Sequence, residues 1–147
     1  MNLELIRDVF IEAKPETVYA YLTEQEKVAE WFAAIVEVDA RPGGIFKCGE
    51  SEEFVVQGEY LETVPYEKVV FTWGGVHGLE AGATTVEITL KKQDNGTQLS
   101  LRHYNVPTQE MADSFGQGWP NRAFPLLKLV AEGGSTDDRC ITSGPCE

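Results

Sequence analysis

The stretch Thr84–Tyr104, TTVEITLKKQDNGTQLSLRHY, holds two runs of alternating apolar and polar residues separated by Asp94-Asn95-Gly96. Asn-Gly between two such runs is the strongest short-range signal for a β-hairpin. The apolar side chains that can face one side of the hairpin are Val86, Ile88, Leu90, Leu99 and Leu101. The stretch therefore predicts two antiparallel strands, Thr84–Lys92 and Thr97–His103, with one face directed to a core.

Four more strands are predicted before this hairpin. Phe54–Val64 and Val69–Trp73 are rich in β-branched and aromatic residues, and a turn at Pro65-Tyr66-Glu67-Lys68 separates them. Two shorter strands, Val36–Asp39 and Ile45–Cys48, come earlier in the chain. The region from Val36 to His103 is thus predicted to be an antiparallel meander.

Arg41-Pro42-Gly43-Gly44 joins the two shorter strands and predicts a type II turn. Pro42 presets a φ of about −65°, and Gly43 can take the positive φ that the third position needs. Gly44 then permits an unusual dihedral angle or a close approach by another backbone segment.

The N-terminal part predicts one strand and two short helices. Leu3–Ile11 alternates as a half-buried strand does, and Pro15 suits the first turn of a helix. Thr23 is expected to cap a second helix, with Glu26 completing a capping box. The apolar face expected of this second helix is Val28, Trp31 and Phe32.

After the hairpin the apolar residues follow helical spacing: Met111, Phe115, Trp119, Ala123, Leu126 and Val130. Pro120 and Pro125 lack a backbone N–H, so we expect a hinge or a break at Gly116–Pro120. Gly133-Gly134 is expected to end the helix. Trp119, beside the expected break, is either a plug in the core or a lid that moves to admit a ligand.

The predicted order is one strand, two short helices, six strands and a long closing helix. It indicates an α+β fold in which a curved antiparallel sheet of about seven strands closes around the C-terminal helix. Because one helix cannot fill a strongly curved sheet, we expect a cavity between the two. Residues 1–134 are expected to form a single domain, and residues 135–147 a polar, flexible tail.

Several segments together resemble one known family. They are FIEAKPETVYAYLTEQEKVAEWF, DARPGGIF, GEYLETVPYEKVVFTW, TTVEITL, GTQLSLRH and the late GW, which run in order from about Phe10 to Ala131. The chain resembles the group of activator-of-Hsp90-ATPase homologues within the START/Bet v 1-like (SRPBCC) helix-grip superfamily. The resemblance implies that fold, but the superfamily includes lipid carriers, hormone receptors, cyclases and co-chaperone modules. Two features depart from the family pattern: the prolines Pro120 and Pro125, and the cysteine-containing tail.

Composition and charge exclude several classes of protein. The formal net charge is −12, from 24 acidic and 12 basic residues, so phosphate backbones and anionic membranes are disfavoured. No apolar run approaches the ~20 residues of a membrane span. Glu4 and Asp8 interrupt the apolar N-terminus, which argues against a signal peptide. We expect a cytoplasmic protein that neither binds nucleic acid nor spans a membrane.

The three cysteines, Cys48, Cys140 and Cys146, form no recognisable metal-binding spacing. Free thiols are expected, with a disulfide between Cys140 and Cys146 as the alternative. The sequence predicts no cofactor and no metal.

The sequence shows no catalytic motif. Of the two histidines, His77 lies in a Gly-rich loop and is expected to be structural. His103 is the one candidate catalytic residue, either a general base or a half-buried histidine held by the backbone. Arg102, its neighbour in a strand, must face the other way.

Aromatic residues are the stronger signal. The predicted ligand-binding residues are Trp31, Phe46, Phe71, Trp73, His103, Tyr104, Phe115 and Trp119. Five of these are expected at the mouth of the cavity, where strand ends meet the closing helix: Trp73, His103, Tyr104, Phe115 and Trp119. Phe54 and Tyr60 complete the aromatic set, most of which is expected to be core.

Three hypotheses for function follow. The first is binding of a small hydrophobic ligand, such as a lipid, a polyketide or a flavonoid-like molecule, in the cavity. The second is a protein-interaction module that binds an Hsp90-type chaperone. The third is a cyclase-like or hydrolase-like enzyme that uses His103 with Tyr104 or a nearby carboxylate.

Overall fold

The computed structural model describes residues 3–76 and 79–133 of the 147-residue chain. Its elements in order are β1 (Leu3–Ile11), α1 (Pro15–Thr23), α2 (Gln25–Trp31), β2 (Ile35–Val38), β3 (Ile45–Ser51), β4 (Phe54–Val64), β5 (Lys68–Trp73), β6 (Thr84–Gln93), β7 (Gly96–Val106), α3 (Gln109–Gly118), the π-helical turn η1 (Trp119–Ala123) and α4 (Phe124–Ala131). The predicted order of elements is confirmed. His77, Cys140, Cys146 and the predicted tail lie outside the described residues.

The seven strands form one antiparallel sheet in the order β1-β7-β6-β5-β4-β3-β2. The predicted hairpin is present, with Val86 opposite His103 and Leu90 opposite Leu99. The pairing register shifts between Gly49 and Ser51, where β3 pairs with β4. Such irregularities increase the local twist and bend a sheet.

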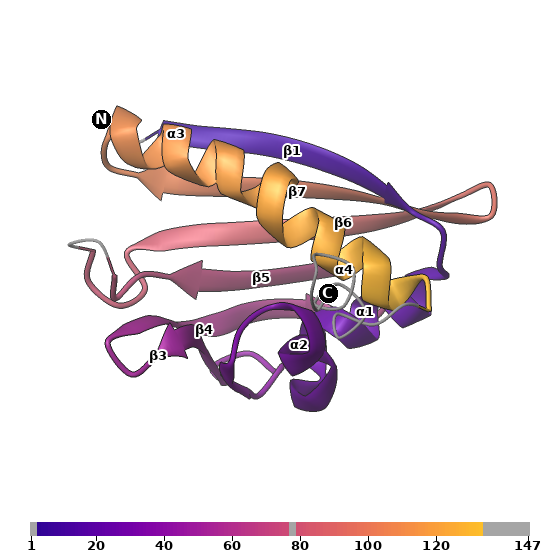
Figure 1. Cartoon of the computed structure of the whole chain (residues 1–147), viewed down its shortest axis with the longest axis horizontal. Coiled ribbons are helices and arrows are strands. Elements are labelled where there is room, and N and C mark those ends of the chain that lie inside the picture. The colour runs from indigo at the N-terminus through magenta and orange to yellow at the C-terminus, as the bar shows by residue number, and fades with distance from the viewer. Residues whose placement is uncertain (1–2, 77–78, 134–147) are drawn as a thin grey trace, which may run out of the picture.

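One long helical segment crosses a single face of this sheet (Figure 1). It consists of α3, η1 and α4, which follow one another without a gap in the chain, and α1 and α2 lie beside its α4 end. The side chains buried between these helices and the sheet form one apolar core. Its most deeply buried members include Ile11, Val18, Val28, Val69, Val86, Leu99, Leu101 and Leu127. The α+β helix-grip fold is therefore confirmed.

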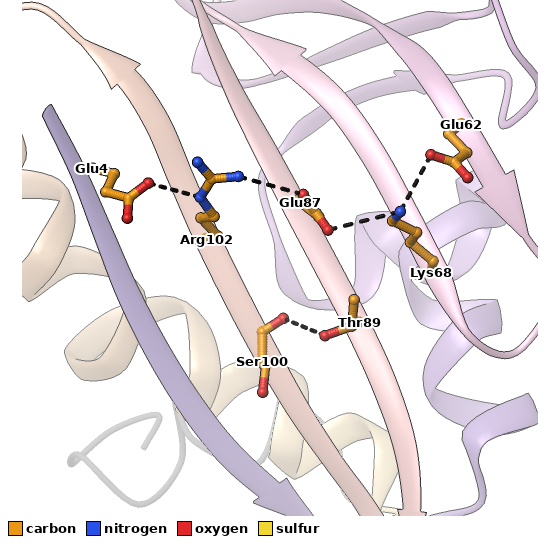
Figure 2. A network of polar contacts seen from close by, with 7 residues as sticks. All are labelled: Glu4, Glu62, Lys68, Glu87, Thr89, Ser100 and Arg102. Atoms are coloured by element: carbon orange, nitrogen blue, oxygen red, sulfur yellow. Dashed lines mark hydrogen bonds and ion pairs between the residues drawn. The ribbon is translucent and has the colours of Figure 1, made fainter. Parts of the chain in front are cut away.

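The opposite face of the sheet carries a row of alternating charges (Figure 2). Arg102 Nε donates to Glu4 Oε1 at 2.7 Å, and its Nη1 lies 3.9 Å from Glu87. Lys68 Nζ continues the row, 3.8 Å from Glu87 and 3.4 Å from Glu62. Exposed ion pairs of this kind contribute about 0–1 kcal/mol each. The row therefore marks this face as the solvated one and places the core, and any cavity, under the helices.

The turn Arg41–Gly44 has the predicted type II geometry. Gly44 N–H donates to the Arg41 carbonyl at 2.7 Å, and Gly43 has a φ of 88°. At Gly44 a Cβ atom would lie 1.9 Å from the Asp39 carbonyl oxygen, so glycine is required there by a close backbone approach.

Gly43→Val is expected to lower the free energy of unfolding by roughly 1–3 kcal/mol, because a β-branched residue is strained at positive φ. The strain is conformational, since no atom lies within 4 Å of a Cβ built at Gly43. Gly43→Asn is the matched control, because asparagine tolerates a left-handed φ. Urea denaturation should rank the variants wild type, Asn, Val in falling stability. Equal stability of the valine and asparagine variants would contradict this account.

The expected break in the C-terminal helix is wrong. The helix continues through Pro120 by widening into η1, where Phe124 N–H donates to the carbonyl of Trp119, five residues earlier. A proline removes one i→i−4 donor and crowds the preceding turn. The wider π turn begins one residue before Pro120 and ends two residues before Pro125, so it absorbs both interruptions within one continuous helix.

Arg7 replaces the helical donor that Pro120 lacks. The carbonyl of Gly116 lies four residues before Pro120 and so loses its helical partner. Arg7 Nε, on β1, donates to this carbonyl at 3.0 Å. A Cβ at Gly116 would lie 2.7 Å from Arg7 Nη2, so the glycine admits the guanidinium. The contact ties β1 to the helix next to η1.

Two local predictions are also corrected. The N-cap of α2 is Glu24 rather than Thr23, and no capping box forms, because the Thr23 hydroxyl donates to the Tyr19 carbonyl instead. Phe54 is not core: it begins β4 on the solvent side and is 62% exposed.

Candidate ligand site

Aromatic rings from the sheet and the helices meet on the inner face. Phe46 stacks on Phe71 with ring centroids 4.1 Å apart, and Trp73 lies 5.3 Å from Trp119. Phe32, at the end of α2, lies about 6 Å from Phe46, Trp73 and Trp119. Three separate parts of the chain thus build one continuous aromatic cluster.

A cavity of about 280 Å³ opens beside this cluster. Its lining comes from the end of α2, the end of β5, and the helical segment α3-η1-α4. The lining residues are Trp31, Phe32, Trp73, Ser114, Phe115, Gly118, Trp119, Arg122, Ala123 and Leu126. The π turn η1 supplies three of them, and such turns are frequent at functional sites.

The structure divides the predicted ligand-binding residues into groups. Trp31, Trp73, Phe115 and Trp119 line the cavity. Phe46, Phe71 and His103 lie behind that lining and contact it through ring packing. The first group alone can touch a ligand in this cavity directly.

Tyr104 does not lie at the mouth of the cavity, which corrects the prediction. β7 continues beyond His103 to Val106, so Tyr104 points to the opposite face of the sheet. Its ring lies 4.1 Å from the Arg102 guanidinium, in the row of charges on the solvated face. The proposed catalytic pair of His103 and Tyr104 is therefore separated by the sheet itself.

Sequence reasoning missed the polar part of the lining. Ser114, Gly118 and Arg122 are exposed residues of the same helical segment. The spacing of the residues could have revealed Arg122. It follows Phe115 by seven residues and Trp119 by three, so it lies on the same face of the helix as these two rings.

His103 is fully buried and held at both ring nitrogens. Trp119 Nε1 donates to His103 Nδ1 at 3.2 Å, and since an indole N–H can only donate, Nδ1 must be unprotonated. The Thr84 hydroxyl donates to the Trp73 carbonyl at 2.8 Å, so it accepts from His103 Nε2–H, also at 2.8 Å. Phe115 stacks on the imidazole at 4.4 Å. The network specifies one neutral tautomer.

Burial lowers the pKa of His103 to about 3. A general base must reach its substrate and carry a pKa near the working pH. Both ring nitrogens of His103 are hydrogen-bonded and its pKa is lowered, so this arrangement favours a structural role, in which His103 links Trp119 to β6, over that of a general base.

Trp73 differs from the two other tryptophans. Trp31 Nε1 donates to the Tyr21 carbonyl at 2.9 Å, and Trp119 Nε1 donates to His103. Trp73 Nε1 is buried and has no partner among the described residues. A buried donor without an acceptor costs about 1–3 kcal/mol and needs an explanation. Trp73 lines the cavity, but its Nε1 has almost no accessible surface, so a molecule in the cavity does not reach this donor unless the ring moves.

Other reactive groups do not form a site in the described residues. Cys48 is buried, and burial raises the pKa of its thiol to about 12, so its thiolate is not accessible as a nucleophile. Within 3–76 and 79–133, no three His, Cys, Asp or Glu side chains converge to hold a metal ion. None of the helices in these ranges combines the length and apolar character that crossing a membrane requires.

Comparison with known proteins agrees with this architecture. The family model of activator of Hsp90 ATPase homolog 1-like proteins matches residues 12–131, which span the segment from α1 to α4. The chain belongs to this family. The whole lining of the cavity lies inside the matched residues, so the site is part of the family domain.

Individual members of the family and its structural relatives vary widely in sequence. The human activator of 90 kDa heat shock protein ATPase homolog 1 is 26% identical over 123 residues. This match covers 84% of the chain but 35% of the human protein, so the chain spans about a third of that relative's length.

Two solved structures have the same fold. The activator-like protein from Rhizobium etli is 29% identical, with a TM-score of 0.72 and coverage of 91% of this chain and 84% of that one. The Aha1 dimer from Colwellia psychrerythraea is 20% identical, with a TM-score of 0.77 and coverage of 90% and 98%.

Proposed function

We propose that this domain binds a small hydrophobic ligand in the cavity between α2, β5 and the segment α3-η1-α4. The observation that carries the proposal is the cavity itself, which is walled by aromatic rings and has Ser114 and Arg122 as polar groups in its lining. Ligand pockets are typically apolar with a few placed polar groups. The same combination is found here.

The volume of the cavity limits the size of the ligand. About 280 Å³ lies just under the usual range of about 300–1,000 Å³ for ligand pockets. A compact molecule of one or two rings suits this space. Of the hydrophobic ligands expected from the sequence, small aromatic polyketide-like compounds fit better than three-ring flavonoids or long-chain lipids.

A cavity-blocking variant tests the proposal. Gly118 lines the cavity, has helical dihedral angles, and has no atom within 4 Å of a Cβ built on it. Gly118→Trp should therefore fold normally and fill the entrance. Gln117→Trp is the matched control, because Gln117 is an exposed residue of the same helix outside the lining.

Binding of a library of lipids, flavonoids and polyketides is measured by chemical-shift changes and thermal shift. We expect saturable binding by wild type and Gln117→Trp, and at least a tenfold loss of affinity in Gly118→Trp. If no library member binds wild type saturably, or if Gly118→Trp binds as well as wild type, the proposal fails.

Interaction with an Hsp90-type chaperone is the second candidate, and the family match favours it. The test is a pull-down with purified Hsp90 together with an assay of its ATPase rate. Charge reversal in the exposed row, Lys68→Glu with Arg102→Glu, is compared with wild type, because these cations lie on the face that the helices leave open. Absence of binding at tens of micromolar would remove this candidate.

A further inference from the structure

The charge of the cavity lining is opposite in sign to the net charge of the chain. The chain carries 24 acidic against 12 basic residues, yet none of the described lining residues is a carboxylate. Arg122 is the one charged side chain among them. A ligand at this site would therefore meet a positive charge in a protein that is strongly negative overall.

Arg122 is also the arginine without a partner in the described part of the chain. The other three described arginines are paired: Arg7 with the Gly116 carbonyl, Arg41 with Asp39 and Arg102 with Glu4. Glu30 and Glu50 line a neighbouring surface hollow with Arg122, but neither lines the cavity. The exposed guanidinium is free to bind an anion bidentately.

The rest of the lining is largely aromatic. Flat apolar surface around the guanidinium comes from Trp31, Phe32, Trp73, Phe115 and Trp119. The indole N–H groups of Trp31 and Trp119 are already bonded to groups of the chain. A complementary molecule needs a flat apolar body and an anionic group.

We propose that the ligand is a one- or two-ring aromatic carboxylate. Its carboxylate binds the Arg122 guanidinium, and its rings pack on the aromatic lining of the cavity. This inference rests on the proposed function of the cavity and specifies its ligand class. The net charge of −12 does not oppose it strongly, because distant charges are screened over about 8 Å at physiological ionic strength.

The test compares 6-hydroxy-2-naphthoate with its methyl ester, which has the same rings and hydroxyl but no charge. Affinities are measured by titration with wild type, Arg122→Gln and the matched control Lys91→Gln, which removes an exposed lysine outside the cavity. We expect wild type and Lys91→Gln to bind the acid roughly tenfold more tightly than the ester, as for one charge-assisted bidentate contact. Arg122→Gln should abolish that preference, so that the acid and the ester bind with similar affinity.

Two further readouts locate the molecule. On binding, the Nε–H resonance of Arg122 should shift more with the acid than with the ester. Raising NaCl from 50 to 300 mM should weaken binding of the acid and leave the ester unaffected.

The outcomes separate the two proposals. Equal affinity of wild type for acid and ester, or a preference for the acid that survives in Arg122→Gln, would overturn the carboxylate assignment while leaving ligand binding intact. If neither compound binds and the library screen is also negative, both proposals fall.

Discussion

Trp119→Ala is expected to lower the free energy of unfolding by about 3–5 kcal/mol, the range for removing a large buried side chain. Trp119 is 5% exposed, and its ring packs against Phe32, Trp73 and Phe124. Its loss also leaves His103 Nδ1 buried without a donor. Urea denaturation followed by far-ultraviolet circular dichroism measures the effect, because this signal does not depend on the deleted indole.

Trp119→Phe is the control for this prediction. It keeps most of the apolar volume and removes the indole N–H, so it should cost roughly 1–3 kcal/mol, the cost of one unsatisfied buried acceptor. The burial of Trp119 in a continuous helix favours a plug in the core over a moving lid. A loss below about 1 kcal/mol in Trp119→Ala, together with parallel changes in the on- and off-rates of a ligand, would support the lid instead.

Acidification from pH 7.5 to pH 5 is expected to remove about 2 kcal/mol of stability through His103 alone. Burial lowers its pKa to about 3 in the folded protein, against 6.5 in the unfolded chain. Between these values the unfolded state binds a proton that the folded state excludes, so stability falls as the pH falls. The contribution is complete above pH 6.5 and is lost progressively down to about pH 3.

His103→Gln isolates this effect. Glutamine can accept from Trp119 and donate to Thr84, but it does not titrate. Chemical denaturation at several pH values between 4.5 and 7.5 should give a steeper pH dependence for wild type, by up to about 1.4 kcal/mol per pH unit. An NMR titration of folded wild type gives a second measurement, in which His103 should remain neutral at pH 5. A pKa near 6.5 for His103 in the folded protein would contradict the network described here.

Local sequence chemistry predicted the elements that depend on a few consecutive residues. The hairpin and the Pro42-Gly43 turn formed where they were expected. The hairpin loop is Asp94-Asn95, with a φ of 51° at Asp94, and Gly43 has a φ of 88°; glycine, asparagine and aspartate tolerate such values. Tyr104 shows the limit of such reasoning. The predicted strand ended at His103, so the alternation of side chains was not applied to Tyr104. In the structure β7 continues to Val106, and this alternation turns Tyr104 to the outer face of the sheet.

The sequence by itself determined the order of elements, the apolar face of each and the supply of aromatic rings, since periodicity and turn chemistry act within short segments. The tertiary structure alone decided which polar groups meet. Arg7 finds the Gly116 carbonyl across 109 residues, and His103 obtains its tautomer from a tryptophan 16 residues away. Arg122 and Trp73 meet at one cavity because the closing helix continues through Pro120 and lies across the end of β5. Such meetings depend on how a helix is placed on a sheet, and that placement is set by the packing of the whole core rather than by any one segment.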